Sequence, residues 1–240
     1  MPGQGDIKML TKQIRICISA GPATAVLLIV ALWPLAQFIP PPSPLLDADW
    51  YAEFYRSNVI GIRMTAVALM LGSTVSVMFY AAMATLTKRM EGEVGPWTMT
   101  LLVASAIGVT TFFCSGVFFA VLGFRPERSV EELYLINDFA WIMLVIPAFP
   151  ASLQAFAMGI ATLGDKRARP ILPRWTGYLN LWFGMLFLPG FLVGVFKSGP
   201  LAWNGVLAFW IPAIFFGLWL LVLAWVVFQR IDDDLLKSQA

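Results

Sequence analysis

One apolar stretch, residues 137–167, constrains the fold more than any other part of the chain. It is long and apolar enough to cross a bilayer, yet Pro147 and Pro150 stand near its middle. Each proline removes a backbone N–H donor and displaces the carbonyl four residues earlier, so the carbonyls of Met143 and Ile146 lose their usual partners. Lipid supplies no replacement at that depth. The sequence therefore predicts a broken spanning helix whose carbonyls are satisfied by neighbouring helices, water or a ligand.

The rest of the chain has the composition of a membrane protein. Hydrophobic residues make up 59% of its 240 residues and charged residues 12%, whereas about 25% of the residues of a soluble domain are charged. Six apolar stretches are each long enough for a spanning helix, and they leave no room for a separate soluble domain. The sequence predicts an all-α, polytopic transmembrane bundle that forms one domain, 1–240. The expected spans are about 14–38, 59–86, 97–122, 138–163, 176–196 and 203–228.

Lys and Arg residues are divided unevenly between the two sides of this predicted bundle. Because basic residues accumulate in cytoplasmic loops, we expect both termini and the loops after the second and fourth spans to be cytoplasmic. This pattern is typical of a plasma membrane of the bacterial inner-membrane type. The basic clusters are short and flank helix ends, so the sequence predicts no nucleic-acid partner. The predicted cytoplasmic side has Lys8, Lys12, Arg15, Lys88, Arg89, Lys166, Arg167, Arg169, Arg174, Arg230 and Lys237, and the other side has Arg56, Arg63, Arg125, Arg128 and Lys197.

Two segments on the predicted outer side are expected to form short interfacial helices. The first, 40–57, has Asp47 and Asp49 as alternative N-caps and places aromatic residues four apart, on one helix face. That face is either an anchor in the headgroup region or a lid over an outward-facing cavity. The second segment, 123–136, contains a capping box that begins at Ser129.

Residue types that support catalysis or metal binding are scarce. The chain has no histidine, which excludes haem, di-iron and copper sites of the histidine-ligated kind. Its two cysteines, Cys17 and Cys114, are expected to lie most of a bilayer apart, so they form no thiolate cluster. No predicted span has a carboxylate near its middle, the usual mark of a proton-coupled transporter. We therefore predict that the protein is not an enzyme and has no metal site and no cofactor.

Polar residues follow the two prolines of the fourth span and mark a predicted ligand site. Ser152 and Gln154 come within four residues of Pro150. The amide of Gln154 has more donors and acceptors than its own helix can satisfy. Together with Pro147 these residues form the predicted binding centre, and the alternative for Gln154 is an interhelical hydrogen bond without a ligand.

Aromatic residues and prolines in the last two spans extend this predicted site. Pro189 and Pro212 are expected to bend their helices, and Trp182 and Trp210 lie deep enough either to line a cavity or to pack between helices. The resulting cavity would be apolar with one polar corner, which suits a lipophilic ligand better than a sugar or an ion. The aromatic residues expected to line it are Phe149, Phe156, Trp182, Phe187, Phe191, Trp210 and Phe215.

Two charged residues near the predicted outer interface are a possible intramembrane ion pair. Arg63 lies about one turn inside the second span and Asp138 begins the fourth. A pairing would lower the cost of desolvating both charges. The alternatives are that Asp138 stabilises the N-terminus of its helix and that Arg63 extends its side chain to the interface.

These observations favour one function and leave a second open. The first is an integral membrane protein that binds or translocates a lipophilic molecule, such as a lipid, sterol, quinone or hydrocarbon. The second is a non-catalytic structural or assembly subunit of a larger membrane complex. The expected partners are membrane lipids or another lipophilic ligand, with further membrane subunits or other copies of the chain as alternatives.

Overall fold

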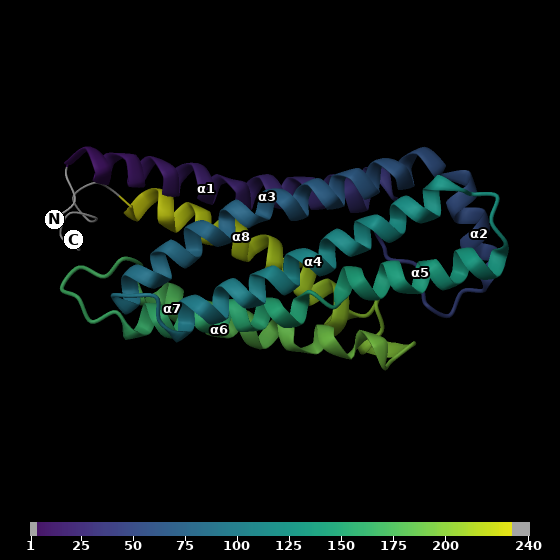
Figure 1. The fold of residues 1–240 in the computed structure, drawn as a ribbon. Helices are drawn as coiled ribbons and strands as arrows, with labels where there is room; N and C mark the ends of the chain where they lie inside the picture. The colour runs from purple at the N-terminus through teal and green to yellow at the C-terminus, as the bar shows by residue number, and fades with distance from the viewer. Residues whose placement is uncertain (1–3, 232–240) are drawn as a thin grey trace.

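Six helical segments that are long and apolar enough to cross a membrane form one elongated bundle (Figure 1). The computed structural model describes residues 4–231, and within that range no strand occurs. The predictions of an all-α fold and of six helices long and apolar enough to span a membrane are therefore confirmed. The α-helices are α1 (Gln4–Val30), α2 (Ala48–Ser57), α3 (Val59–Glu91), α4 (Pro96–Phe124), α5 (Val130–Val145), α6 (Ala148–Gly164), α7 (Arg174–Phe187) and α8 (Ile211–Arg230). Two π-helical segments, η1 (Ala31–Leu35) and η4 (Val206–Trp210), and two 3₁₀ segments, η2 (Leu188–Gly194) and η3 (Gly199–Leu201), complete them.

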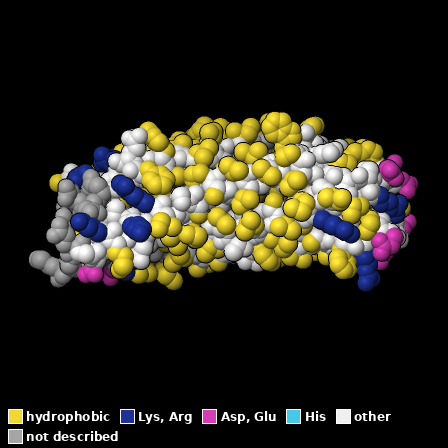
Figure 2. All heavy atoms as spheres, turned by 90° about the horizontal axis from the view of Figure 1, so that it is seen from above, with side chains coloured by type: hydrophobic (Ala, Val, Ile, Leu, Met, Phe, Trp, Pro, Cys, Tyr) yellow, Lys and Arg dark blue, Asp and Glu magenta, His cyan; other side chains and the backbone are white. Residues whose placement is uncertain are grey.

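The chain crosses the bundle six times, so α1 begins at the end where α8 finishes (Figure 1). We call this the basic end; it also holds the connections 92–95 and 165–173. The opposite end, the α2 end, holds α2 and the connection 125–129. Ten of the fifteen described Lys and Arg residues belong to the basic end, and hydrophobic side chains cover the middle of the face in Figure 2. Lys237 lies outside the described residues.

Small residues set the spacing of α6 and α7. A Cβ atom at Gly159 would lie 3.0 Å from the carbonyl oxygen of Gly177, and one at Gly177 would lie 2.7 Å from the side chain of Leu163. A larger residue at either position would therefore push the two helices apart. Close backbone approach through small residues is how membrane helices gain packing energy when both partners are already in lipid.

The break in the fourth span is at the predicted place, but its hydrogen bonding differs from the prediction. Helix α5 ends at Val145 and α6 begins at Ala148, with Pro147 between them. The carbonyl of Ile146 accepts the N–H of Phe149 at 3.0 Å. The prediction that this carbonyl needs water, a ligand or another helix was therefore wrong, because a tighter turn satisfies it locally.

The two segments expected to form short outer helices fold differently from one another. The N-terminus of α2 is capped as predicted, since Asp47 Oδ1 accepts the N–H of Trp50 at 2.8 Å. The capping box of Ser129 and Glu132 is also present. It starts α5, however, which continues directly into the fourth span. The prediction of a separate short helix over 123–136 was wrong because nothing after the capping box interrupts the helix.

Candidate ligand cavity

Four spans depart from regular α-helical geometry, and all four departures border one cavity. Pro34 lies within the π-helical η1, and Pro212 is the second residue of α8, which begins where the π-helical η4 ends. The fourth span breaks at residues 146–147, and α7 gives way to 3₁₀ geometry after Phe187, just before Pro189. Prolines cannot donate the backbone hydrogen bond, and π turns and kinks accommodate that loss. The irregular backbone thus opens space that straight helices would fill.

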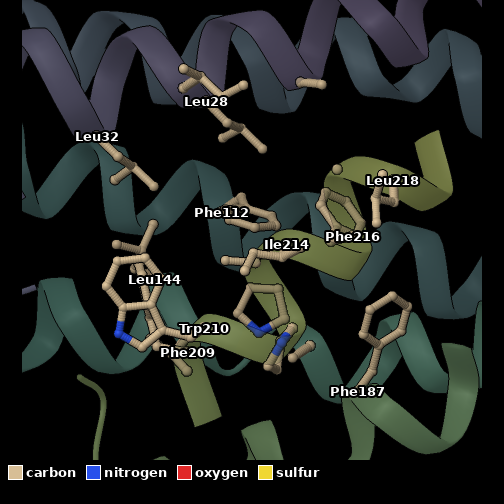
Figure 3. A pocket seen from close by; sticks show the side chains of 18 of the residues that line it. Leu28, Leu32, Phe112, Leu144, Phe187, Phe209, Trp210, Ile214, Phe216 and Leu218 are labelled. Atoms are coloured by element: carbon tan, nitrogen blue, oxygen red, sulfur yellow. The ribbon is translucent and has the colours of Figure 1, made fainter. Parts of the chain in front are cut away.

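The cavity has a volume of about 430 Å³ and an almost entirely apolar wall (Figure 3). That volume is within the range of about 300–1,000 Å³ found for small-molecule sites. No charged side chain lines it, and the indole N–H groups of Trp33 and Trp210 are the polar side-chain atoms of its lining residues. The lining residues are Ala25, Leu28, Ile29, Leu32, Trp33, Ile39, Phe112, Leu144, Val145, Pro147, Ala148, Phe187, Ala208, Phe209, Trp210, Pro212, Ala213, Ile214, Phe216, Gly217, Leu218 and Leu221.

The cavity opens between α1 and α8. Near the basic end these helices touch: Arg15 donates to the carbonyl of Ile231 at 2.9 Å, and a Cβ atom at Gly21 would lie 3.3 Å from the carbonyl oxygen of Leu220. Beyond that contact α8 moves away from α1 toward the α2 end (Figure 1). All large exposed side chains of the lining belong to these two spans, so the mouth lies on the apolar surface of the bundle. They are Ile29, Trp33, Ile214, Leu218 and Leu221.

Two of the six residues predicted to bind a ligand line this cavity. Pro147 and Trp210 are part of its wall. Pro150 packs toward α4, where a Cβ atom at Gly108 would lie 3.8 Å from its ring. The hydroxyl of Ser152 donates to the carbonyl of Ala148, one turn earlier in the same helix.

Trp182 lies on the surface of the bundle. Its side chain is 53% exposed, and its ring meets Phe215 edge-on at a centroid distance of 5.2 Å. Of the seven aromatic residues expected to line a cavity, Phe187 and Trp210 do so.

Gln154 lies inside the bundle next to the cavity rather than in its wall. Its Nε2 donates to the carbonyl of Ala104 on α4 at 3.2 Å, so it makes the interhelical hydrogen bond that was the alternative interpretation. Its amide also interacts with the hydroxyl of Tyr80 on α3. Its Oε1 is buried and has no hydrogen-bond partner among residues 4–231. One acceptor of Gln154 thus remains unused.

Arg63 and Asp138 find separate partners. Arg63 Nε donates to the carbonyl of Gly123 at 2.7 Å, and Asp138 Oδ1 accepts from Asn137 at 3.3 Å. Across the described part of the chain the two make no ion pair with each other. A backbone carbonyl therefore binds Arg63 and a neighbouring amide binds Asp138, where the sequence predicted that the two charges bind each other.

An aromatic cluster at the α2 end takes up most of α2. Tyr55 donates to Asn137 Oδ1 at 2.6 Å, and Tyr51 donates to the carbonyl of Ser43 at 2.9 Å. Burial raises the pKa of the Tyr51 hydroxyl, and the neighbouring Tyr134 raises it further. Burial likewise raises the pKa of Tyr55. Helix α2 packs mainly against α5 and contributes no residue to the cavity wall, so it does not act as a lid on this cavity.

Sequence reasoning missed most of the cavity wall. The eighth helix and η4 contribute Ala208, Ala213 and Gly217, small residues that leave room where larger ones would fill it. The intervals of five and four residues between these small side chains are a pattern that could have indicated this part of the cavity wall. Phe112 and Phe216 carried no comparable signal, because aromatic residues are common in every span.

The described residues contain no group of three His, Cys, Asp or Glu side chains that could hold a metal ion. Comparison with protein-family models, curated proteins and solved structures found no match for this chain. The cavity is therefore the feature on which a functional assignment depends.

Proposed function

We propose that this membrane protein binds a lipophilic molecule in the cavity between α1 and α8 and exchanges it with the surrounding bilayer. The observation that carries the proposal is the combination of an apolar wall, a volume of about 430 Å³ and a mouth on the apolar surface. A sugar, an ion or an amino acid would lose its hydration there without gaining hydrogen bonds. The apolar part of a lipid, sterol, quinone or hydrocarbon would lose no hydrogen bonds there.

The position of the mouth supports entry of the ligand from the lipid phase. Trp33, which borders it, is 64% exposed on the apolar surface. A molecule dissolved in the bilayer would reach the cavity sideways, without crossing water. The irregular segments η1 and η4 form parts of the wall, and such segments rearrange more readily than continuous α-helix. Translocation would follow if their rearrangement changed the side on which the ligand leaves.

We also propose that the basic end faces the cytoplasm of a bacterial-type inner membrane. The excess of Lys and Arg at that end supports this orientation. Labelling of single cysteines with a membrane-impermeant reagent tests it. After Cys17 and Cys114 are replaced by serine, a cysteine at Ser43 should react in intact cells, and one at Gly92 should react only after lysis.

Filling the cavity tests the proposed function. Gly217 lines the cavity and a Cβ atom there meets no atom within 4 Å, so Gly217→Leu adds bulk at the cavity wall where its first carbon has free space. Gly194→Leu is the matched control, because Gly194 has the same free space and does not line the cavity. In native mass spectrometry of protein extracted gently from its own membrane, a stoichiometric mass of lipid size should be present in the wild type and in Gly194→Leu. In Gly217→Leu the fraction of protein that carries this mass should fall at least tenfold.

An equal ligand occupancy in all three proteins would contradict the proposal. The same spectra test the alternative that the protein is a structural or assembly subunit. A co-purifying polypeptide with no specific small mass would favour that alternative and direct attention to the partner chain.

A further inference from the structure

A small second chamber, whose lining includes four hydroxyl-bearing residues, lies directly behind the apolar cavity. It is lined by Thr24, Ser73, Ser76 and Tyr80, together with Val109 and three residues that also belong to the cavity wall. Those shared residues are Leu28, Phe112 and Phe216 (Figure 3). The rings of Phe112 and Phe216 lie 6.0 Å apart at 33° to one another. One layer of side chains therefore separates an apolar cavity from four hydroxyl groups.

Three hydroxyl groups of this chamber already donate a hydrogen bond and are left as acceptors. Thr24 donates to the carbonyl of Gly72 at 3.3 Å, Ser73 to that of Val109 at 2.6 Å and Ser76 to that of Ser73 at 2.6 Å. Each of the three hydroxyls has thus used its single proton and keeps its acceptor lone pairs.

Tyr80 supplies the complementary donor. Its hydroxyl interacts with the Gln154 amide and makes no donor hydrogen bond within residues 4–231. Tyr80 is buried. The Oε1 of Gln154, in the same region, is buried and has no hydrogen-bond partner in the described chain. Buried polar atoms rarely remain without partners, which indicates that something outside the chain completes this network.

We propose that the ligand of the apolar cavity carries one uncharged hydroxyl group and inserts it between Leu28, Phe112 and Phe216 into this chamber. The inference rests on the proposed function and narrows its ligand to a long-chain, isoprenoid or sterol-like alcohol. A hydroxyl group matches the chamber because it can donate to Ser73 or Ser76 and accept from Tyr80. An ether or ketone oxygen can only accept, and a carboxylate or phosphate would bring a charge that no described residue of the wall neutralises.

The chamber is small enough that only the terminal group of a ligand can enter. Its volume of about 10 Å³ is close to the space of one water-sized probe. A hydroxyl group has that size, whereas a phosphate or a sugar headgroup does not. The bulk of the ligand therefore stays in the apolar cavity.

Photolabelling with matched probes tests the inference. The probes are 1-hexadecanol with a mid-chain diazirine and its methyl ether, which keeps the acceptor oxygen and loses the proton. In the purified protein in nanodiscs, the alcohol should label the cavity peptides about fivefold more strongly at equal concentration. That factor corresponds to one net hydrogen bond of about 1 kcal/mol.

Single-residue variants test whether the preference for the alcohol arises in the chamber. Ser76→Ala should reduce the preference for the alcohol while the ether labels as before. Tyr80→Phe should weaken labelling by both probes, because each keeps the oxygen that accepts from Tyr80. Ser105→Ala is the matched control, because Ser105 is buried and also bonds a carbonyl of its own helix but does not line the chamber. It should keep the fivefold preference.

The outcomes separate this inference from the proposed function. Equal labelling by alcohol and ether, with both signals lost in Gly217→Leu, would mean that the cavity binds lipophilic molecules but that the chamber holds only a water. That result would overturn the inference alone. Equal labelling that Gly217→Leu leaves unchanged would overturn the proposed function as well.

Discussion

The two halves of the bundle are packed in different ways, and the cavity lies where they meet. Toward the basic end large rings are a smaller part of the core, the glycines Gly159 and Gly177 bring α6 and α7 close together, and the helices are continuous. Toward the α2 end the core is built from large rings such as Phe38 and Trp141, whose centroids lie 4.8 Å apart. The cavity is lined by members of both cores.

This difference explains why space remains at the boundary. At Gly159 and Gly177 the backbones of α6 and α7 approach closely, so the basic half is close-packed through its glycines. Large rings hold the helices apart in the other half, and π and 3₁₀ segments connect the two spacings. A rigid ring cannot deform to fill the gap that such a change in spacing leaves. The cavity between α1 and α8 is therefore a consequence of joining two kinds of core.

The largest effect is expected where the small-residue packing is removed. Gly159→Leu should lower the free energy of unfolding by about 3 kcal/mol, because its side chain would meet the backbone of Gly177. Thermal unfolding in detergent, followed by circular dichroism, measures the loss. Gly194→Leu adds the same atoms where a Cβ meets nothing within 4 Å and should leave stability nearly unchanged. Equal stability of the two variants would show that the basic half is not close-packed through its glycines.

An intermediate effect is expected at a polar contact inside the core of the basic half. Trp219 Nε1 donates to Asn180 Oδ1 at 2.7 Å, and both side chains are fully buried. Asn180→Ala should cost about 1–2 kcal/mol because it leaves the indole N–H without an acceptor. The comparison variant is Trp219→Phe, which removes the donor as well. If Asn180→Ala proves no less stable than Trp219→Phe, the bond does not fix the packing of α7 against α8.

The smallest effect on stability at neutral pH is expected from the buried tyrosines of the aromatic half. This effect is confined to that half. Burial raises the pKa values of Tyr51 and Tyr55 above the value of about 10 for an unfolded chain. The folded state therefore holds these protons more tightly, so its stability is complete below pH 10 and falls as the pH rises above 10.

Hydrogen exchange between pH 7 and 11 measures this loss. Protection of α2 should decrease above pH 10 before that of α6 and α7, once the intrinsic exchange rate is corrected for. In Tyr51→Phe/Tyr55→Phe the extra alkaline loss should disappear, although stability at pH 7 falls because Asn137 loses its hydroxyl partner. Simultaneous loss of protection in both halves would mean that the two cores unfold as one unit.

Local features of the sequence predicted local features of the fold well. The break at Pro147, the Asp47 cap and the Ser129 capping box are all present, because each depends on a few neighbouring residues. The predicted site was less complete. Gln154 and Trp182 were singled out for their chemistry, but the cavity depends on which helix faces meet, and these two side chains face α4 and the surface of the bundle.

The sequence by itself determined that this chain is all-helical, with six helices long and apolar enough to cross a membrane, because hydrophobic length and proline chemistry act locally. It also determined that ionisable and metal-binding side chains are scarce in the spans. Only the tertiary structure decided where the cavity lies. That position depends on α8 diverging from α1 beyond the contact at Gly21 and on the π segments that bring Phe209 and Trp210 to the same space as Leu28. Contacts between residues nearly two hundred positions apart have no local signal, so packing alone sets them.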